Sequence, residues 1–244
     1  MESVSYFVSA ASKRRHCRSR NKDLHDNFAS YRRSACRILG MNQQHVQSII
    51  ASVKGTRIVD ASKYIDAQGI LQLHEYGIDY FGENRVDAFL PKYEALKEHK
   101  DIHWHFIGHL QSNKAKMIAD KIECLHSLDS LKLARILDEN RDTPLDCFVE
   151  LHLTDNEAKS GVKPEDLPAF LEGLKNYSKI HVVGFMAMSD ADMDDEQKKG
   201  VFLKAKALAD SYGYHEISMG MSEDYLLAIE AGATTVRLGR ILLQ

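Results

Sequence analysis

The chain has 244 residues, of which 44% are hydrophobic and 27% are charged, and its formal net charge is −3 at pH 7. This length and hydrophobic content predict one large globular domain, for which an α/β barrel is a common architecture. The charge gives no electrostatic footprint for nucleic acid or an anionic membrane, and we find no apolar run long enough to span a bilayer. The four cysteines are far apart and form no Cys-x-x-Cys pair. This pattern predicts free thiols in a reducing compartment, and therefore a cytoplasmic location.

The first 22 residues differ in composition from the rest, with several serines and six basic residues against the single acid Glu2. Such a basic leader is typical of an organellar transit peptide, of a disordered extension, or of a start codon assigned too early. Hydrophobic residues then recur at helical spacing over residues 24–39, which predicts a helix on the outside of the barrel. We therefore expect a leader over residues 1–22 and a single domain, with added N-terminal helices, over residues 23–244.

From residue 45 onward the pattern is that of alternating helices and strands. A short helix is expected over His45–Val53, and later stretches of helical length include Ile65–Tyr76 and Gln197–Tyr212. Helices should stop at three glycines, Gly77, Gly213 and Gly232. Eight strands are expected, which is the count of a TIM (β/α)8 barrel: Arg57–Ser62, Asp79–Gly82, His103–Gly108, Cys124–Leu128, Asp146–Leu153, His181–Met188, Glu216–Gly220 and Thr235–Gly239.

The first of these strands runs into a lysine, Lys63. In an extended strand Val59, Ala61 and Lys63 share one side, so the lysine would project where the strand leaves the sheet. Burial at that point can lower a lysine pKa toward the neutral amine that attacks carbonyls. A Schiff base with pyridoxal phosphate or with a sugar aldehyde is then possible. The alternative interpretation is a solvated lysine just past a strand.

Two segments near the C-terminus predict an anion site. Ser218–Asp224 passes from a strand through Gly220 into a helix whose N-cap would be Ser222, and backbone N–H groups at a helix start bind phosphate. Val236–Arg240 ends the next strand at Gly239, where the backbone can approach a ligand closely. Each loop alone could be an ordinary cap or turn. As loops after the seventh and eighth strands, however, they occupy the recurrent phosphate site of TIM barrels.

His103, His105 and His109 could suggest a metal site, because alternate strand positions face the same way. We nevertheless expect no metal. His103 and His105 lie early in the third strand, away from the barrel's upper face, and no carboxylate or cysteine partner is evident.

Short segments spread over residues 57–243 together form a specific combination: Ala61-Ser62-Lys63, Phe81-Gly82-Glu83-Asn84, His103-Trp104-His105-Phe106-Ile107-Gly108, Leu110-Gln111-Ser112-Asn113-Lys114, Lys159-Ser160-Gly161, Gly184-Phe185-Met186, Ser218-Met219-Gly220-Met221-Ser222, Ala228-Ile229-Glu230-Ala231-Gly232-Ala233 and Arg237-Leu238-Gly239. Through them the chain resembles the pyridoxal phosphate homeostasis protein family, also called the YggS or proline synthase co-transcribed family. That family is similar to the N-terminal barrel of bacterial alanine racemase.

The resemblance implies roles for particular residues. Lys63 would be the lysine that holds pyridoxal 5′-phosphate (PLP) as a covalent aldimine. Ser222, with the backbone of Gly239 and Arg240, would bind the cofactor phosphate, and Asn84 would line the pocket at the end of the second strand.

Arg237 would approach the pyridine nitrogen of the cofactor. A cation there disfavours protonation of the nitrogen, so the cofactor would be a weaker electron sink. The chain also departs from the family pattern at Asp60, which strand parity turns toward the helix layer, where an unpaired carboxylate would be costly. Further departures are Arg240, in place of a small hydroxyl residue, and an end at Gln244.

The function implied is that of a protein that holds PLP on Lys63 and serves intracellular PLP homeostasis without robust catalysis. Its partners would be PLP and PLP-dependent apoenzymes, and we expect a monomer rather than a dimer. One alternative is a racemase-like PLP enzyme. Racemisation needs an acid/base on each face of the substrate, however, and in alanine racemase one comes from a second domain that we do not expect here. The other alternative is a Schiff-base aldolase, whose lysine would be expected on a later strand.

Overall fold

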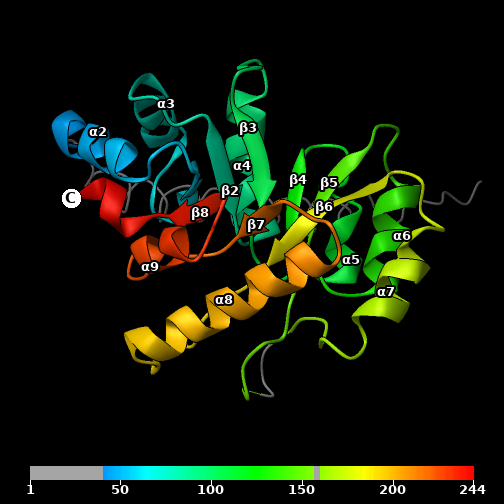
Figure 1. Cartoon of the computed structure of the whole chain (residues 1–244). Coiled ribbons are helices and arrows are strands. Elements are labelled where there is room, and N and C mark those ends of the chain that lie inside the picture. Colours follow the sequence, from blue (N-terminus) through cyan, green and yellow to red (C-terminus); the bar gives the residue numbers. More distant parts are fainter. Residues whose placement is uncertain (1–40, 157–159) are drawn as a thin grey trace, which may run out of the picture. The chain divides into compact units, whose positions relative to one another are not determined.

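The computed structural model describes residues 41–156 and 160–244, which form a closed barrel of eight parallel strands. The strands follow one another around the barrel in sequence order, and β1 pairs with both β2 and β8. The predicted TIM barrel is therefore confirmed (Figure 1). The expected leader and the expected helix over residues 24–39 lie outside the described residues. The strands are β1 (Arg57–Ala61), β2 (Tyr80–Glu83), β3 (His103–Phe106), β4 (Cys124–Leu128), β5 (Leu145–Glu150), β6 (Ile180–Met186), β7 (Glu216–Ser218) and β8 (Thr235–Leu238).

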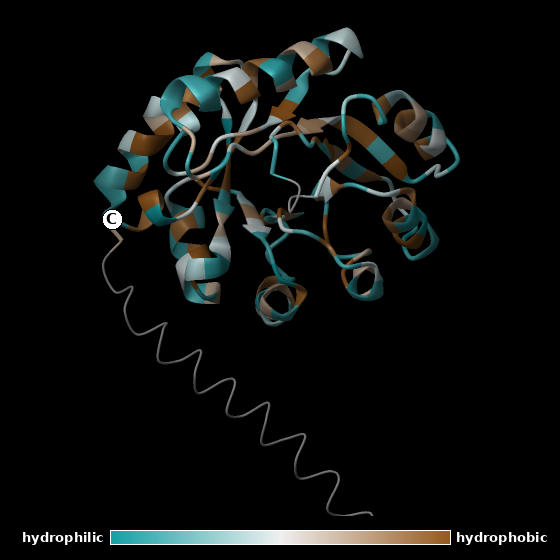
Figure 2. Cartoon of the chain, turned by 90° about the horizontal axis from the view of Figure 1, so that it is seen from below, coloured by the Kyte–Doolittle hydropathy of each residue, from teal (hydrophilic) through white to brown (hydrophobic). Residues whose placement is uncertain are grey.

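Helices precede β1 and connect the strands. Each longer helix turns an apolar face to the barrel and a polar face outward, so the helices in Figure 2 carry both brown and teal residues. In α3, for example, Ile70 and Leu73 are fully buried, and the Asp66 carboxylate caps the helix by accepting the Gly69 N–H at 2.9 Å. None of the described helices is long and apolar enough to cross a membrane. The helical segments are α2 (Gln43–Ser52), η1 (Ser62–Tyr64), α3 (Ala67–Glu75), α4 (Val86–Leu96), α5 (Ser112–Ala115), α6 (Leu131–Glu139), α7 (Leu167–Leu174), α8 (Asp195–Ser211), α9 (Tyr225–Glu230) and η2 (Arg240–Leu243).

The predicted strands have the right number and order, but several were drawn too long at their carboxyl ends. Strand β1 ends at Ala61, and the next residues form the 3-10 turn η1, which the Ile65 N–H closes on the Ser62 carbonyl at 3.1 Å. The prediction that Lys63 continues the strand parity is therefore wrong, because Lys63 lies in η1. The chain leaves the ladder at these ends to form the loops above the barrel.

Packing outside the barrel differs from packing inside it. Between the barrel and α4, Phe81, Phe89 and Trp104 pack together, and the Phe89 and Trp104 rings meet edge to face at 5.3 Å. Inside the barrel the packing is partly polar. His126 on β4 bonds Ser218 on β7 at 2.8 Å, and since these strands are not neighbours, the contact crosses the interior.

Candidate functional site

A cavity of about 650 Å³ opens at the carboxyl ends of the strands. All six residues predicted for the cofactor site line it: Lys63, Asn84, Ser222, Arg237, Gly239 and Arg240. They come from β1, β2, β7 and β8 or from the loops that follow these strands, and the closure of the barrel brings them together. The structure thus places the predicted residues at one site, while their roles stay predictions.

Lys63 is exposed at the cavity and not buried, so the structure agrees with the solvated alternative for this side chain. Its Nζ lies 5.0 Å from the centroid of the half-exposed Tyr64 ring. The residue before it is fixed, because the buried Ser62 hydroxyl donates to the Glu83 carboxylate at 3.0 Å and the Ser62 carbonyl accepts from Lys92 at 2.7 Å. An exposed side chain therefore follows a residue whose side chain and backbone carbonyl are both held.

A buried charged cluster lies behind this turn and consists of Asp60, Glu83 and Lys92. Lys92 pairs with Glu83, and both side chains are almost fully buried. Asp60 faces the helix layer as expected, and its Oδ2 has no hydrogen-bond partner among the described residues. Burial raises the pKa of Asp60 well above its usual range. The nearby Lys92 opposes this rise and Glu83 adds to it.

Ser222 and Gly239 meet on the phosphate side of the predicted site. The Gly239 N–H donates to Ser222 Oγ at 3.3 Å. A Cβ on Gly239 would lie 3.2 Å from the Ala61 Cβ, so only glycine fits here without a shift of its neighbours. The expectation that Ser222 caps the next helix is wrong, because α9 begins after Asp224, whose Oδ1 accepts the Met221 N–H at 2.7 Å. Residues 222–224 form turns, so the Ser222 hydroxyl faces Gly239 instead.

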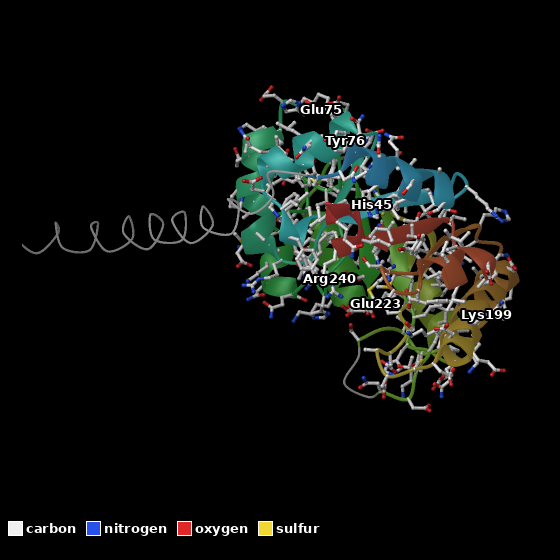
Figure 3. All side chains as sticks on the ribbon, turned by 90° about the vertical axis from the view of Figure 1, so that its left-hand side faces the viewer. His45, Glu75, Tyr76, Lys199, Glu223 and Arg240 are labelled. Atoms are coloured by element: carbon white, nitrogen blue, oxygen red, sulfur yellow. The ribbon has the colours of Figure 1, made fainter. Side chains whose placement is uncertain are left out.

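Arg240 lies at the rim with its side chain directed to Glu223. Its Nη2 donates to Glu223 Oε1 at 3.0 Å, and both side chains are mostly exposed. Figure 3 shows the two residues next to each other. The charge that replaces a small hydroxyl residue here is thus already paired at the surface, where such a pair contributes little to stability.

Arg237 is buried at the cavity wall and held by backbone and side-chain acceptors. It donates from Nη1 to Ser218 O at 2.9 Å and to Ser218 Oγ at 2.6 Å, and from Nη2 to Ala187 O at 3.1 Å. Burial lowers the pKa of Arg237 to about 10, against the opposing effect of Asp224 and Glu150. The guanidinium is therefore still charged at neutral pH.

Asn84 presents a buried Oδ1 that has no hydrogen-bond partner among the described residues. Its backbone packs so closely against Gly108 that a Cβ there would lie 2.4 Å from the Asn84 carbonyl oxygen. The Asn84 backbone is consequently held in place, and its side chain lines the cavity with an acceptor that a ligand could use.

Sequence reasoning missed Glu150, which also lines the cavity. The side chain is buried at the end of β5, accepts from the Ser160 hydroxyl at 3.0 Å, and has its pKa raised by burial. The available signal was a carboxylate directly after the apolar run of residues 147–149, at the carboxyl end of a strand.

The three histidines considered for a metal are not gathered at one place. His103 bonds Glu123 at 2.7 Å, His109 pairs with Asp129 at 3.3 Å, and only His105 is buried. His105 instead forms a close group with Cys124 and His126, whose ligand atoms lie within 4.8 Å of one another. The facing His105 and His126 nitrogens are 2.8 Å apart. This is a hydrogen-bond distance and is shorter than the roughly 3.3 Å between two nitrogens on a tetrahedral zinc.

The barrel and its site define the class of protein. Residues 39–243 match the family described as "Alanine racemase, N-terminal domain". Alanine racemase from Corynebacterium glutamicum shares this fold, with a TM-score of 0.63 at 14% identity over 82% of this chain and 59% of that chain.

Proteins with higher sequence identity to this chain show which family within this class it belongs to. The pyridoxal phosphate homeostasis protein of Aquifex aeolicus is 36% identical over 195 residues, which cover 76% of this chain and 85% of that protein. The protein of the same name from Synechocystis is 37% identical over 80% of this chain and 94% of that one. PipY of Synechococcus elongatus, solved with PLP bound, superposes with a TM-score of 0.77 at 28% identity, over 83% of this chain and 99% of that chain. This chain belongs to the pyridoxal phosphate homeostasis protein family.

Proposed function

We propose that this chain binds PLP as a Schiff base on Lys63 and serves PLP homeostasis rather than catalysis. The observation that carries the proposal is the single cavity that gathers Lys63, Ser222, Gly239 and Arg237. The names of the relatives and the PLP-bound PipY structure support the same ligand. The role we propose is cytoplasmic, for a monomer, with PLP-dependent apoenzymes as the recipients.

The residues that line the cavity fit both the phosphate and the ring hydroxyl of PLP. The Ser222 hydroxyl and the Gly239 N–H lie within hydrogen-bond distance of each other, and a phosphate oxygen placed beside them could accept from both. The unsatisfied Asn84 Oδ1 offers an acceptor to a hydroxyl of the ligand. The cavity volume of about 650 Å³ lies in the range of small-molecule sites.

When bound, PLP supplies an aldehyde with which a primary amine condenses, losing one water molecule. Lys63 offers that amine at the cavity. The charged Arg237 would disfavour a proton on a neighbouring pyridine nitrogen, which weakens the cofactor as an electron sink. Such a site favours storage of the cofactor over its use in catalysis.

The binding experiment compares the wild-type chain with Lys63→Ala. We expect Lys63→Ala to lose the visible absorbance of a Schiff base on PLP addition, while circular dichroism stays unchanged because the exposed side chain contributes little to the core. Lys198→Ala, which removes another lysine of the same cavity, is the matched control and should keep the absorbance. Loss of absorbance in Lys198→Ala, with retention in Lys63→Ala, would contradict the assignment. Rapid racemisation of alanine or serine by the wild-type protein would contradict the non-catalytic role.

A further inference from the structure

Four buried polar side chains form a chain of hydrogen bonds across the barrel interior. His105 Nδ1 lies 2.8 Å from His126 Nε2, and His126 Nδ1 lies 2.8 Å from Ser218 Oγ. Arg237 Nη1 then donates to Ser218 Oγ at 2.6 Å. Each of the four residues is at most 5% exposed, and of these four only Arg237 lines the cavity. We call this set of four residues the interior chain.

The chemistry of Arg237 fixes the direction of every bond in the interior chain. A guanidinium only donates, so Ser218 Oγ accepts from Arg237. The hydroxyl has one proton, and the acceptor that the described residues offer it is His126 Nδ1. His126 therefore carries its proton on Nε2 and donates to His105 Nδ1, which leaves the His105 proton on Nε2 as well.

A proton added to His126 would disrupt this order. Both His126 Nδ1 and Arg237 would then donate to the one hydroxyl, and two buried positive charges would face each other across it. The environment opposes that state. Burial lowers the pKa of His126 well below its usual range, and the neighbouring His105 and Arg237 lower it further. Burial likewise lowers the pKa of His105 to about 3.

The interior chain also decides which edge of Arg237 is free. Its Nη1 hydrogens are used by the Ser218 carbonyl and hydroxyl, and one Nη2 hydrogen is used by the Ala187 carbonyl. Of the five guanidinium hydrogens, the one on Nε and the second on Nη2 have no acceptor among the described residues. Nε and Nη2 flank one edge of the guanidinium, and we take this edge to be the one left for a ligand in the cavity.

We propose that His126 is a positioning residue of the PLP site: through Ser218 it holds Arg237 so that its free edge is presented to the cofactor. The proposal rests on the proposed function for the identity of the ligand. The order of the hydrogen bonds does not depend on that function and can be measured without the cofactor.

The first test uses the full-length, cofactor-free chain labelled with ¹⁵N in its histidine rings. The His126 signals, assigned by their loss in His126→Asn, should show at pH 7 a neutral ring with the proton on Nε2. In Ser218→Ala the unprotonated Nδ1 should shift toward the value of a nitrogen without a hydrogen bond. A proton on His126 Nδ1, or a charged ring at pH 7, would overturn the proposal.

The second test measures PLP release and the pH midpoint of the visible absorbance in His126→Leu and His126→Asn. Asparagine can place an amide oxygen where Nδ1 accepts from Ser218, whereas leucine cannot. We expect His126→Leu to release PLP about tenfold faster, equivalent to about 1.4 kcal/mol, and to shift the midpoint. His126→Asn should stay within about twofold of the wild type.

The experiments distinguish a purely structural role of His126 from its proposed role in positioning Arg237. If His126→Leu lowers the melting temperature but leaves both release and midpoint unchanged, the residue is merely structural and the proposal is wrong. If His126→Leu does not fold, Ser218→Ala breaks the same contact and takes the same readouts. If the wild-type chain binds no PLP, the proposed function fails and His126 has no PLP site to position, while the ring signals still test the order of the hydrogen bonds in the interior chain.

Discussion

At the residue scale, Lys63 is positioned by its neighbours and not by burial of its own side chain. The Ser62 hydroxyl and carbonyl are both bound inside the protein, and the Lys63 amine is left at the cavity. Ser222 and Gly239, which are hydrogen-bonded to each other, line the same cavity as Lys63. An exposed amine beside this cavity suits the proposed site, which must both take up and release its ligand.

Ser222→Ala should weaken PLP retention without preventing attachment to Lys63. The change removes one donor to a charged phosphate, a contact that typically contributes about 1.5–3 kcal/mol, so we expect the dissociation constant to rise at least about tenfold. Equilibrium dialysis measures this directly. Ser160→Ala removes a hydroxyl of the same cavity that is bound to Glu150, and it serves as the control. Equal retention by Ser222→Ala and the wild type would count against the phosphate assignment.

Asp60→Asn should stabilise the protein in a pH-dependent way. The folded-state pKa of Asp60 is raised above its unfolded value, so its ionised form opposes folding. The Asp60 carboxyl of the wild type contributes fully to the free energy of unfolding only below its unfolded pKa of about 3.9. This stabilising contribution is lost as the pH rises through the folded-state pKa. The melting temperature of Asp60→Asn should therefore exceed that of the wild type at pH 7, by a margin equivalent to about 1 kcal/mol or more, and the margin should shrink toward pH 4. A margin that is constant with pH, or that grows in acid, would show that Asp60 is not the titrating group.

At the scale of elements, α4 is fastened to the Lys63 turn by an ion pair that is removed from water. Lys92 on α4 donates to the Ser62 carbonyl and pairs with Glu83 at the end of β2. The same helix buries Phe89 against Trp104. The position of the turn therefore depends on how this helix packs.

Lys92→Met should destabilise the fold strongly, because it leaves the Glu83 carboxylate and the Ser62 carbonyl without their partner. Breaking a buried pair from one side costs about 3–5 kcal/mol. Urea denaturation measures the loss. Lys97→Met, at the exposed end of the same helix, should change stability by less than about 0.5 kcal/mol. Equal effects of the two substitutions would contradict a special role for the buried pair.

Hydrophobic periodicity was sufficient to predict where the elements occur but not where they end. The expected helix Gln197–Tyr212 is α8 to within two residues, and Gly77, Gly213 and Gly232 all have positive φ, as helix-ending glycines do. The end of β1 could not be predicted, because Ser62 and Lys63 are compatible with either an extended strand or a 3-10 turn. The hydrogen bonds of Ser62 with Glu83 and Lys92 stabilise the 3-10 turn, and these two partners are distant from Ser62 in sequence.

At the scale of the whole barrel, the order in which the strands pair brings together residues that no local motif connects. Residues 63 and 240 reach one cavity because β1 closes against β8. The six residues that the resemblance named for the cofactor site line one cavity, and their roles stay predictions. The resemblance could not show that Arg240 is paired with Glu223, that Lys63 is exposed, or that Arg237 is held from within the barrel. The hydrogen bond between His126 and Ser218 joins positions 92 residues apart on strands that are not neighbours. The spacing of residues in the sequence therefore could not predict it.

The most direct measurement of the central claim is to load the purified full-length chain with PLP, reduce it with borohydride, and map the modified peptide by mass spectrometry. Reduction converts a Schiff base into a stable amine, so the modified lysine is identified without ambiguity. We expect one modified residue, Lys63, and the loss of the visible absorbance of the Schiff base on reduction. Modification of a different lysine, or no modification in a protein that retains PLP, would show that Lys63 does not hold the cofactor as a Schiff base.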